Sequence, residues 1–485
     1  MKIPRCMSTQ HPDNVTIPFF SESTDFEGED EIKEAYYAFS HLGIDEQMWD
    51  CEGKEIDTYV VKKLLTKYSQ YFKEHRLGKD KFITLRIPNP TVEKSEAKIL
   101  LETLESIPRS FDASKLFYSD DTPPIFEVIL PMTASSKCLE RIYRYYSDFV
   151  IGKKNKLFMA GDITIGDWIG DFKPEIVNVI PLFEDMEHML DAHNITEQYL
   201  HGKHVQYQRV FLARSDPAAN YGNISAVLLN KIALYKLHVL SGDIDVDIVP
   251  IIGVGSAPFR GNLKPGTVER VIKEYPSVQT FTIQSAFKYD NPPNDVKEGI
   301  RILNDIRPGK AHEFDEKRSL EIVMKYTHEY QKQLSELAPT INLVARHVPS
   351  RRKRKLHIGL FGYSRDIGGI NLPRAITLTS ALYSIGLPPE ILGLNALNTD
   401  DFQFLKNVYI NFESDLKDAF KYLNVDTPFM PKLLKSKLEE LSFSFEIDRE
   451  HKETTDYILR ALKNDNLFDV REYILKAASI RNFLG

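Results

Sequence analysis

Two acidic residues in this sequence each stand where an apolar run stops. Glu184 ends the run IVNVIPLFE, and Asp216 follows YQRVFLAR after a single serine. Two carboxylates that meet at one edge of a sheet, with water and substrate oxygens completing the shell, suit Mg²⁺ or Mn²⁺. Two alternatives stay open. Either acid can cap the helix that follows or join an ion pair, and Glu184 can instead pair with His188 one helical turn later.

Several arginines occupy comparable places in the sequence. Arg260 lies in GVGSAPFRGN, where small residues let backbone N–H groups approach an anion. Arg86 ends FITLR, Arg365 follows KLHIGLFGYS, and Arg374 lies in INLPRAI. Because a planar guanidinium matches phosphate and carboxylate oxygens bidentately, arginines beside paired acids indicate a dianionic substrate bridged to a metal. That combination is typical of phosphoryl or enolate chemistry.

Other polar residues carry less information by themselves. His11 lies in the turn-rich segment STQHPDN, and its spacing assigns it no role. His201 and His204 have no third ligand at the spacing of a zinc site. The basic run RRKRK at 351–355 has three interpretations: a nucleic-acid patch, a solvated loop that leads into a strand, or a group that binds an anion from outside the site.

The elements that would position these residues are short apolar runs separated by sequence typical of helices. The runs are continuous rather than alternating, as in parallel strands covered on both faces. Their positions are 82–88, 126–132, 156–162, 176–183, 207–214, 246–253, 278–284 and 355–362.

Eight such strands would close a (β/α)8 TIM barrel, whose active-site groups lie at the C-terminal strand ends. The first eighty residues are expected to be mostly helical, and helix-forming sequence dominates after Arg374. We therefore expect an α/β protein with many additional helices. Residues 1–485 would form a single catalytic domain, with a barrel core over about 80–375 and a helical C-terminal part over 376–485.

Composition and charge exclude several classes of protein. The 485 residues carry 62 basic and 69 acidic side chains, a formal net charge of −7, so no whole-chain field attracts nucleic acid or anionic lipid. The three cysteines, Cys6, Cys51 and Cys138, lie far apart and indicate free thiols in a reducing compartment. The start of the chain lacks the apolar segment of a signal peptide, and no stretch approaches the roughly 20 apolar residues of a spanning helix. We expect a cytoplasmic protein that binds neither membrane nor nucleic acid.

An ordered set of motifs from about residue 8 to about residue 400 resembles archaeal-type phosphoenolpyruvate carboxylase. The motifs are STQHPDN, ITLRIPNP, FEVILPMT, VIPLFED, ARSDPAANYG, GVGSAPFRG, TIQSAFKYD, FGYSRDIGG and LPRAITLTSALYSIGLPPE. The resemblance implies a (β/α)8 barrel with many extra helices, a homotetramer, and Mg²⁺ or Mn²⁺ as cofactor. It also implies a lyase of carbon dioxide fixation, which converts phosphoenolpyruvate and bicarbonate to oxaloacetate and phosphate.

The resemblance also assigns roles to individual residues. Glu184 and Asp216 match metal ligands, and His11 matches the catalytic histidine of the family. The matched arginines serve phosphate or transition-state charge: Arg260 and Arg365 as catalytic groups, with Arg86 and Arg374 as further substrate contacts.

This chain also departs from the longer family members. Their glycine-rich loop is shortened here to PFRG, and the lysine that follows the matched aspartate is replaced by Pro217. Anion binding must therefore use other groups, such as Arg214, Lys288 or the 351–355 run. The terminal segment around Asn482 resembles one that takes part in aspartate inhibition, but we do not transfer that regulation.

In the implied mechanism, bicarbonate attacks phosphorus to give carboxyphosphate and a metal-stabilised enolate. His11 then takes the carboxyphosphate proton, and the enolate captures the CO₂ that is released. One alternative is a Mg²⁺-dependent barrel lyase or aldolase that acts on a 2-oxo acid, which bicarbonate dependence separates from a carboxylase. The other is a non-enzymatic protein that binds nucleic acid through 351–355, which predicts salt-sensitive binding.

Overall fold

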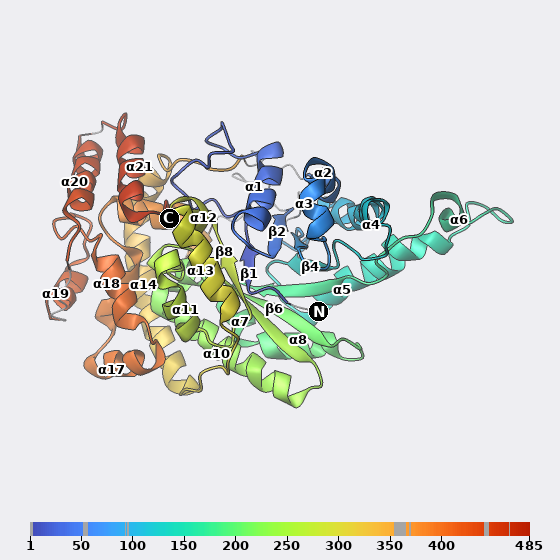
Figure 1. Ribbon diagram of the computed structural model, residues 1–485. Coiled ribbons are helices and arrows are strands. Elements are labelled where there is room, and N and C mark those ends of the chain that lie inside the picture. The colour runs from blue at the N-terminus through green and yellow to red at the C-terminus, as the bar shows by residue number, and fades with distance from the viewer. Residues whose placement is uncertain are drawn as a thin grey trace.

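The computed structural model describes most of the chain and shows a central barrel flanked by helices (Figure 1). The described residues are 3–51, 57–92, 94, 97–353, 365–367, 370–440, 446–464 and 466–485. The predicted strand at 355–362 lies outside them.

Strands β1 to β8 form a closed barrel in sequence order, with parallel pairing throughout and β8 returning to pair with β1. The predicted TIM barrel is therefore confirmed. The strands are β1 (Cys6–Ser8), β2 (Glu46–Asp50), β3 (Phe82–Arg86), β4 (Glu127–Leu130), β5 (Asn178–Phe183), β6 (Tyr207–Ala213), β7 (Asp247–Gly253) and β8 (Thr280–Ile283).

Two features of the barrel differ from the predicted strands. The predicted strand at 156–162 is wrong: this segment is a series of exposed turns, and its apolar Leu157 and Met159 are 54% and 71% exposed. The first two strands instead come from the part of the chain expected to be helical. β1 has only three residues, and β2 begins and ends on buried acids, so neither forms an apolar run. The barrel strands accordingly span Cys6–Ile283, whereas a barrel core over about 80–375 was expected.

Helices cover the barrel on its outside, as expected for alternating strands and helices. Those up to the last barrel strand are α1 (Glu29–Ser40), α2 (Val60–Lys67), α3 (Ser69–Glu74), α4 (Ile99–Tyr118), α5 (Ser136–Arg144), α6 (Ile165–Ile169), α7 (Met186–Leu190), α8 (Ala192–Leu200), α9 (Ser215–Tyr221), α10 (Asn223–Asp243) and α11 (Val268–Glu274). By length and composition α10 could cross a membrane, but 72% of its most apolar window is buried, so it is a core helix.

The chain after β8 is mainly helical; α12 and α13 lie over the barrel beside β8, and the later helices lie to one side of it in Figure 1. Its helices are α12 (Ser285–Tyr289), α13 (Pro293–Asp305), α14 (Glu316–Ala345), α16 (Ala375–Ser384), α17 (Thr399–Val408), α18 (Phe412–Phe420), α19 (Lys432–Glu440), α20 (Arg449–Lys463) and α21 (Val470–Arg481). Between α14 and α16, strands β9 (Arg365–Ile367) and β10 (Ile370–Leu372) form an antiparallel pair. A helical C-terminal part is thus confirmed, and its treatment as one domain with the barrel stays a prediction.

The interior of the barrel holds a polar layer near the N-terminal strand ends and an apolar cluster. We call the buried residues Glu46, Glu127, Arg209 and Thr280 the lower layer; they come from β2, β4, β6 and β8. Alternate strands contribute the four side chains of one layer in such barrels. A separate buried cluster of apolar side chains follows: Met7, Met48, Ile129, Ile180, Leu182, Phe211, Ala213 and Ile251. The C-terminal strand ends beyond this cluster form the mouth of the barrel.

Candidate active site

The two predicted metal ligands follow neighbouring strands at the mouth. Glu184 comes directly after β5, and Asp216 comes three residues after the end of β6, in the first turn of α9. The strands pair in parallel, with Phe183 opposite Leu212, so both acids leave the same edge. Both side chains are partly exposed. Neither residue is a helix cap, because Asp185 caps α7 and Arg214 occupies the N-cap position of α9.

The end of β4 fixes the carboxylate of Glu184. The backbone N–H of Met132 donates a 3.0 Å hydrogen bond to Oε2 of Glu184. Met132 has a positive φ of 47°, a conformation that costs free energy for a residue with a side chain. Asn89 holds this turn by donating to the carbonyl groups of Pro131 and Met132, at 2.8 and 3.1 Å. The strained turn therefore places an N–H group against the acid.

Arg260 lies in a tight turn after β7 that requires glycines. A Cβ on Gly261, whose φ is +115°, would lie 2.6 Å from Cγ1 of Val254. A Cβ on Gly255 would lie 3.0 Å from Cζ of Arg260, so this glycine lets the guanidinium lie against the backbone. Arg260 is 1% exposed. Its guanidinium donates to four oxygens: Oγ of Ser215, Oδ2 of Asp13, Oε1 of Gln284 and the backbone oxygen of Gly485.

Asp13 is the charged partner of Arg260. Its Oδ2 lies 3.2 Å from Nη1 of Arg260, and its Oδ1 accepts a 2.7 Å hydrogen bond from the N–H of Ala286. Burial raises the pKa of Asp13, and the nearby Arg260 opposes this effect. Leu484 donates its backbone N–H to the carbonyl of Asp13 at 2.7 Å. The segment after β1 thus joins the Arg260 turn and the end of the chain.

His11 follows β1 by three residues and is partly exposed at the same edge of the barrel. Its Nδ1 lies 2.9 Å from Oγ1 of Thr9. Its carbonyl accepts hydrogen bonds from the N–H groups of Asp13 and Ser285, at 3.1 and 3.3 Å. The predicted catalytic histidine therefore lies on a short segment held from β1 on one side and from α12 on the other.

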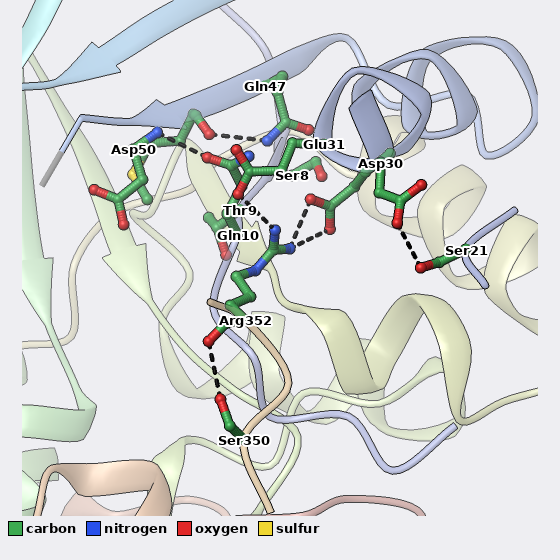
Figure 2. Close-up of polar contacts among 12 residues, drawn as sticks. Ser8, Thr9, Gln10, Ser21, Asp30, Glu31, Gln47, Asp50, Ser350 and Arg352 are labelled. Carbon is green, nitrogen blue, oxygen red and sulfur yellow. Dashed lines mark hydrogen bonds and ion pairs between the residues drawn. The ribbon is translucent and has the colours of Figure 1, made fainter. Parts of the chain in front are cut away.

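Arg86 ends β3 and forms a bidentate pair with Asp50 at the end of β2. Nε and Nη2 of Arg86 donate to the two carboxylate oxygens of Asp50, at 3.0 and 2.6 Å. The N–H of Asp50 in turn donates to Oε1 of Gln10 at 2.9 Å (Figure 2). The side chains of Arg86 and Asp50 are 11% and 4% exposed. The fork of Arg86 is thus engaged by a carboxylate of the protein itself.

The remaining predicted arginines lie in different surroundings. Arg214 is buried beneath the Arg260 turn, where it donates to the carbonyl of Phe259 and to Oδ1 of Asn223, at 3.2 and 2.5 Å. Arg374 is exposed at the N-cap position of α16. Arg365 begins β9, and its side chain lies outside the described part of the chain.

The basic run at 351–355 does not present its first two arginines to solvent. Arg351 is 6% exposed and donates to the carbonyls of Asn14 and Val15. Arg352 is 3% exposed and pairs with acids of α1 (Figure 2). Lys288, another anion-binding candidate, is also buried, and its Nζ donates to three oxygens of the protein. Arg351 and Lys288 hold the end of β1 and the segment after it in place, whereas Arg352 holds α1.

The donor set at Glu184 and Asp216 fits a magnesium-type ion. Mg²⁺ usually binds through one or two carboxylates and keeps water or substrate oxygens in its remaining positions. Within the described ranges, no group of three or more His, Cys, Asp or Glu side chains is arranged to hold a metal ion. Nδ1 of the alternative ligand His188 lies 2.6 Å from Oδ2 of Asp185.

Sequence reasoning missed several residues of this site. Asp50 was hidden because β2 was expected to be helical. Asp13 and Thr9 lie in the STQHPDN segment, but only His11 was selected from it. Gln284 directly follows β8, a position that the barrel rule already marks as part of the mouth.

Comparison with known proteins gives matches that span the whole chain. A family model described as phosphoenolpyruvate carboxylase matches residues 3–485. The chain is 59% identical to phosphoenolpyruvate carboxylase of Methanothermobacter thermautotrophicus and 56% identical to that of Methanospirillum hungatei. It is 51% identical to the protein of the same name from Pyrococcus furiosus, and each of the three matches covers 100% of both chains.

Proposed function

Because the chain belongs to the phosphoenolpyruvate carboxylase family, we propose that it joins phosphoenolpyruvate and bicarbonate to give oxaloacetate and phosphate. The observation that carries the proposal is the full-length family match. That match includes every strand end that contributes a group to the mouth. The expected homotetramer and cytoplasmic location stay predictions.

In the proposed reaction, a bicarbonate oxygen attacks phosphorus and the enolate of pyruvate leaves, which gives carboxyphosphate. His11 takes the carboxyl proton of carboxyphosphate, which then breaks into CO₂ and phosphate, and His11 returns the proton to phosphate. The enolate carbon captures the CO₂. Arg365 and Arg374 provide positive charge for the phosphate and carboxylate groups of the substrate. Arg260 is buried and paired with Asp13, so it supports the turn after β7, and its direct catalytic contact with substrate stays a prediction.

Glu184 and Asp216 would hold Mg²⁺ or Mn²⁺ at the neighbouring ends of β5 and β6. When bound, the ion supplies Lewis-acid stabilisation of charge on phosphate and enol oxygens. Met132 supports this role, because its N–H orients one oxygen of Glu184. The buried contacts of Arg214 support the Arg260 turn, and a direct substrate contact of Arg214 stays a prediction.

The first test replaces Asp216 with alanine and measures oxaloacetate formation in a coupled assay with Mg²⁺ supplied, with and without bicarbonate. We expect wild-type activity to require bicarbonate and Asp216→Ala to lose about 10²–10³-fold in kcat or more, as when a group that stabilises transition-state charge is removed. His188→Ala is the matched control, since His188 belongs only to the alternative ligand set, and we expect it to keep activity. Full activity in Asp216→Ala would contradict the metal assignment. Turnover without bicarbonate would favour a lyase or aldolase.

A further inference from the structure

A buried cluster of four charged residues lies directly behind the His11 segment. Its members are Lys288 from α12, Glu31 and Glu34 from α1, and Arg352 from the segment after α14. Each side chain is at most 3% exposed, and the two positive and two negative charges balance. Figure 2 shows Arg352 beside Glu31 and close to the Ser8–Gln10 segment. In this neutral cluster each charge has an opposite charge beside it, and removing one member would leave a buried charge that is costly.

Lys288 links this cluster to the end of β1. Its ammonium donates to Oε1 of Glu34 at 2.9 Å, to Oγ of Ser8 at 3.0 Å and to the carbonyl of Thr9 at 3.0 Å. An ammonium has three donors, so all of them are used. Glu34 is held in turn by Nη2 of Arg352, which donates to both of its carboxylate oxygens, at 2.7 and 2.6 Å.

Both backbone polar groups of Thr9, its N–H and its carbonyl, are consequently held by hydrogen bonds. Its N–H donates to the carbonyl of Ile283 in β8 at 3.0 Å, and its carbonyl accepts from Lys288. Thr9 is fully buried. From this fixed backbone, Oγ1 reaches Nδ1 of His11 at 2.9 Å.

We propose that Thr9 is a positioning residue that holds the His11 ring by Nδ1 and thereby directs Nε2 to the proton of the reaction. This inference rests on the proposed role of His11. A hydroxyl accepts a hydrogen bond from Nδ1–H in both the neutral ring and the imidazolium, so the contact survives the gain and loss of a proton at Nε2. Because it carries no charge, Thr9 orients the ring without adding the electrostatic stabilisation that a carboxylate partner would give to the imidazolium.

The experiment compares Thr9→Val, which keeps the shape of the side chain, with Thr9→Ser, which keeps the hydroxyl. In each variant we would measure oxaloacetate formation, phosphate release and the thermal midpoint of unfolding. We expect Thr9→Val to lower the kcat of carboxylation about 10- to 100-fold, part of the roughly 10²–10⁴-fold that general acid–base catalysis provides. The KM for phosphoenolpyruvate should change little, and Thr9→Ser should restore most of the activity.

A double-mutant cycle with His11→Asn separates positioning from a merely structural effect. If Thr9 acts through His11, Thr9→Val changes neither the residual carboxylation nor the residual phosphoenolpyruvate hydrolysis of His11→Asn. An equal loss in both backgrounds, or no loss in the wild-type background, would overturn the role of Thr9 alone. Full carboxylation in His11→Asn would overturn the proposed role of His11 and the role of Thr9 with it.

Discussion

The two ends of the barrel use the same residue types in opposite ways. In the lower layer, Arg209 bonds to Glu46 and Glu127, at 2.7 and 2.9 Å, and all three side chains are at most 6% exposed. At the mouth, Glu184, Asp216 and His11 are partly exposed, although buried pairs such as Asp13 with Arg260 lie beside them.

The difference in exposure between the two ends follows from the hydrogen-bond partners of the acids at each end. The lower layer is closed by hydroxyl groups of the barrel itself: Thr84 donates to Glu46 at 2.5 Å, and Tyr207 donates to Glu127 at 3.2 Å. At the mouth, the N–H of Met132 holds one oxygen of Glu184, and the side chain of Glu184 stays partly exposed. Paired acids and arginines therefore indicate function only where water and substrate can reach them.

The largest expected effect comes from breaking the lower layer with Arg209→Met. It leaves two buried carboxylates without their cation, and we expect the free energy of unfolding to fall by about 3–5 kcal/mol. The kcat of the folded enzyme should stay close to wild type. Chemical denaturation and the coupled assay measure the two quantities. The control is Arg209→Met combined with Glu46→Leu and Glu127→Leu, which should recover stability because no buried charge remains. A loss of activity without a loss of stability would contradict the comparison.

A second variant, Glu34→Gln, tests a buried cluster at the mouth end. Hydrogen bonds to charged groups contribute about 1.5–3 kcal/mol, so we expect a loss of that order at pH 7. Carboxylation should also fall, because Lys288 then holds Thr9 less firmly. Glu298→Gln is the matched control, since its exposed pair with Arg301 should leave both quantities unchanged.

The pH dependence of Glu34→Gln has a definite sign. Burial raises the pKa of Glu34, but Arg352 and Lys288 outweigh burial and lower the pKa from 4.5 to about 2. A carboxyl group with a lowered pKa contributes stability above its unfolded pKa and loses it as the pH falls towards the folded one. The difference in stability between wild type and Glu34→Gln should therefore be greatest above about pH 4.5 and shrink between 4.5 and 2. A difference that grows on acidification would contradict the pairing.

The sequence predicted the barrel and its later strands better than it predicted the first two strands. Long, doubly covered strands precede Glu184 and Asp216, which places both at the mouth, and β5 to β8 coincide with predicted runs. The role of the two acids as metal ligands stays a prediction. β1 and β2 were not predicted. β1 has only three residues, too few to show a periodicity, and β2 begins and ends on the buried acids Glu46 and Asp50.

The partners of the predicted residues could not be read from spacing at all. Asp13 and Arg260 lie 247 residues apart, and Lys288 and Glu34 lie 254 apart. Such contacts depend on the closure of the barrel, which brings the end of β8 beside β1. A basic run such as 351–355 likewise reads as a surface patch until the fold shows that Arg351 and Arg352 are buried.

The smallest expected effect, from Arg86→Lys, tests whether an arginine of the mouth faces the protein or the substrate. Lysine keeps the positive charge but cannot form the bidentate contact with Asp50, so we expect a loss of about 1 kcal/mol in the free energy of unfolding. Because Nε and Nη2 of the guanidinium bond to Asp50, the substrate experiences mainly its charge. The KM for phosphoenolpyruvate should therefore rise by less than about threefold, which is less than about half of one tenfold step in affinity on a free-energy scale. Arg86→Met removes the charge as well and should raise the KM further. If Arg86→Lys raises the KM as much as Arg86→Met does, the guanidinium contacts the substrate directly, and Arg86 belongs with the groups that bind phosphoenolpyruvate.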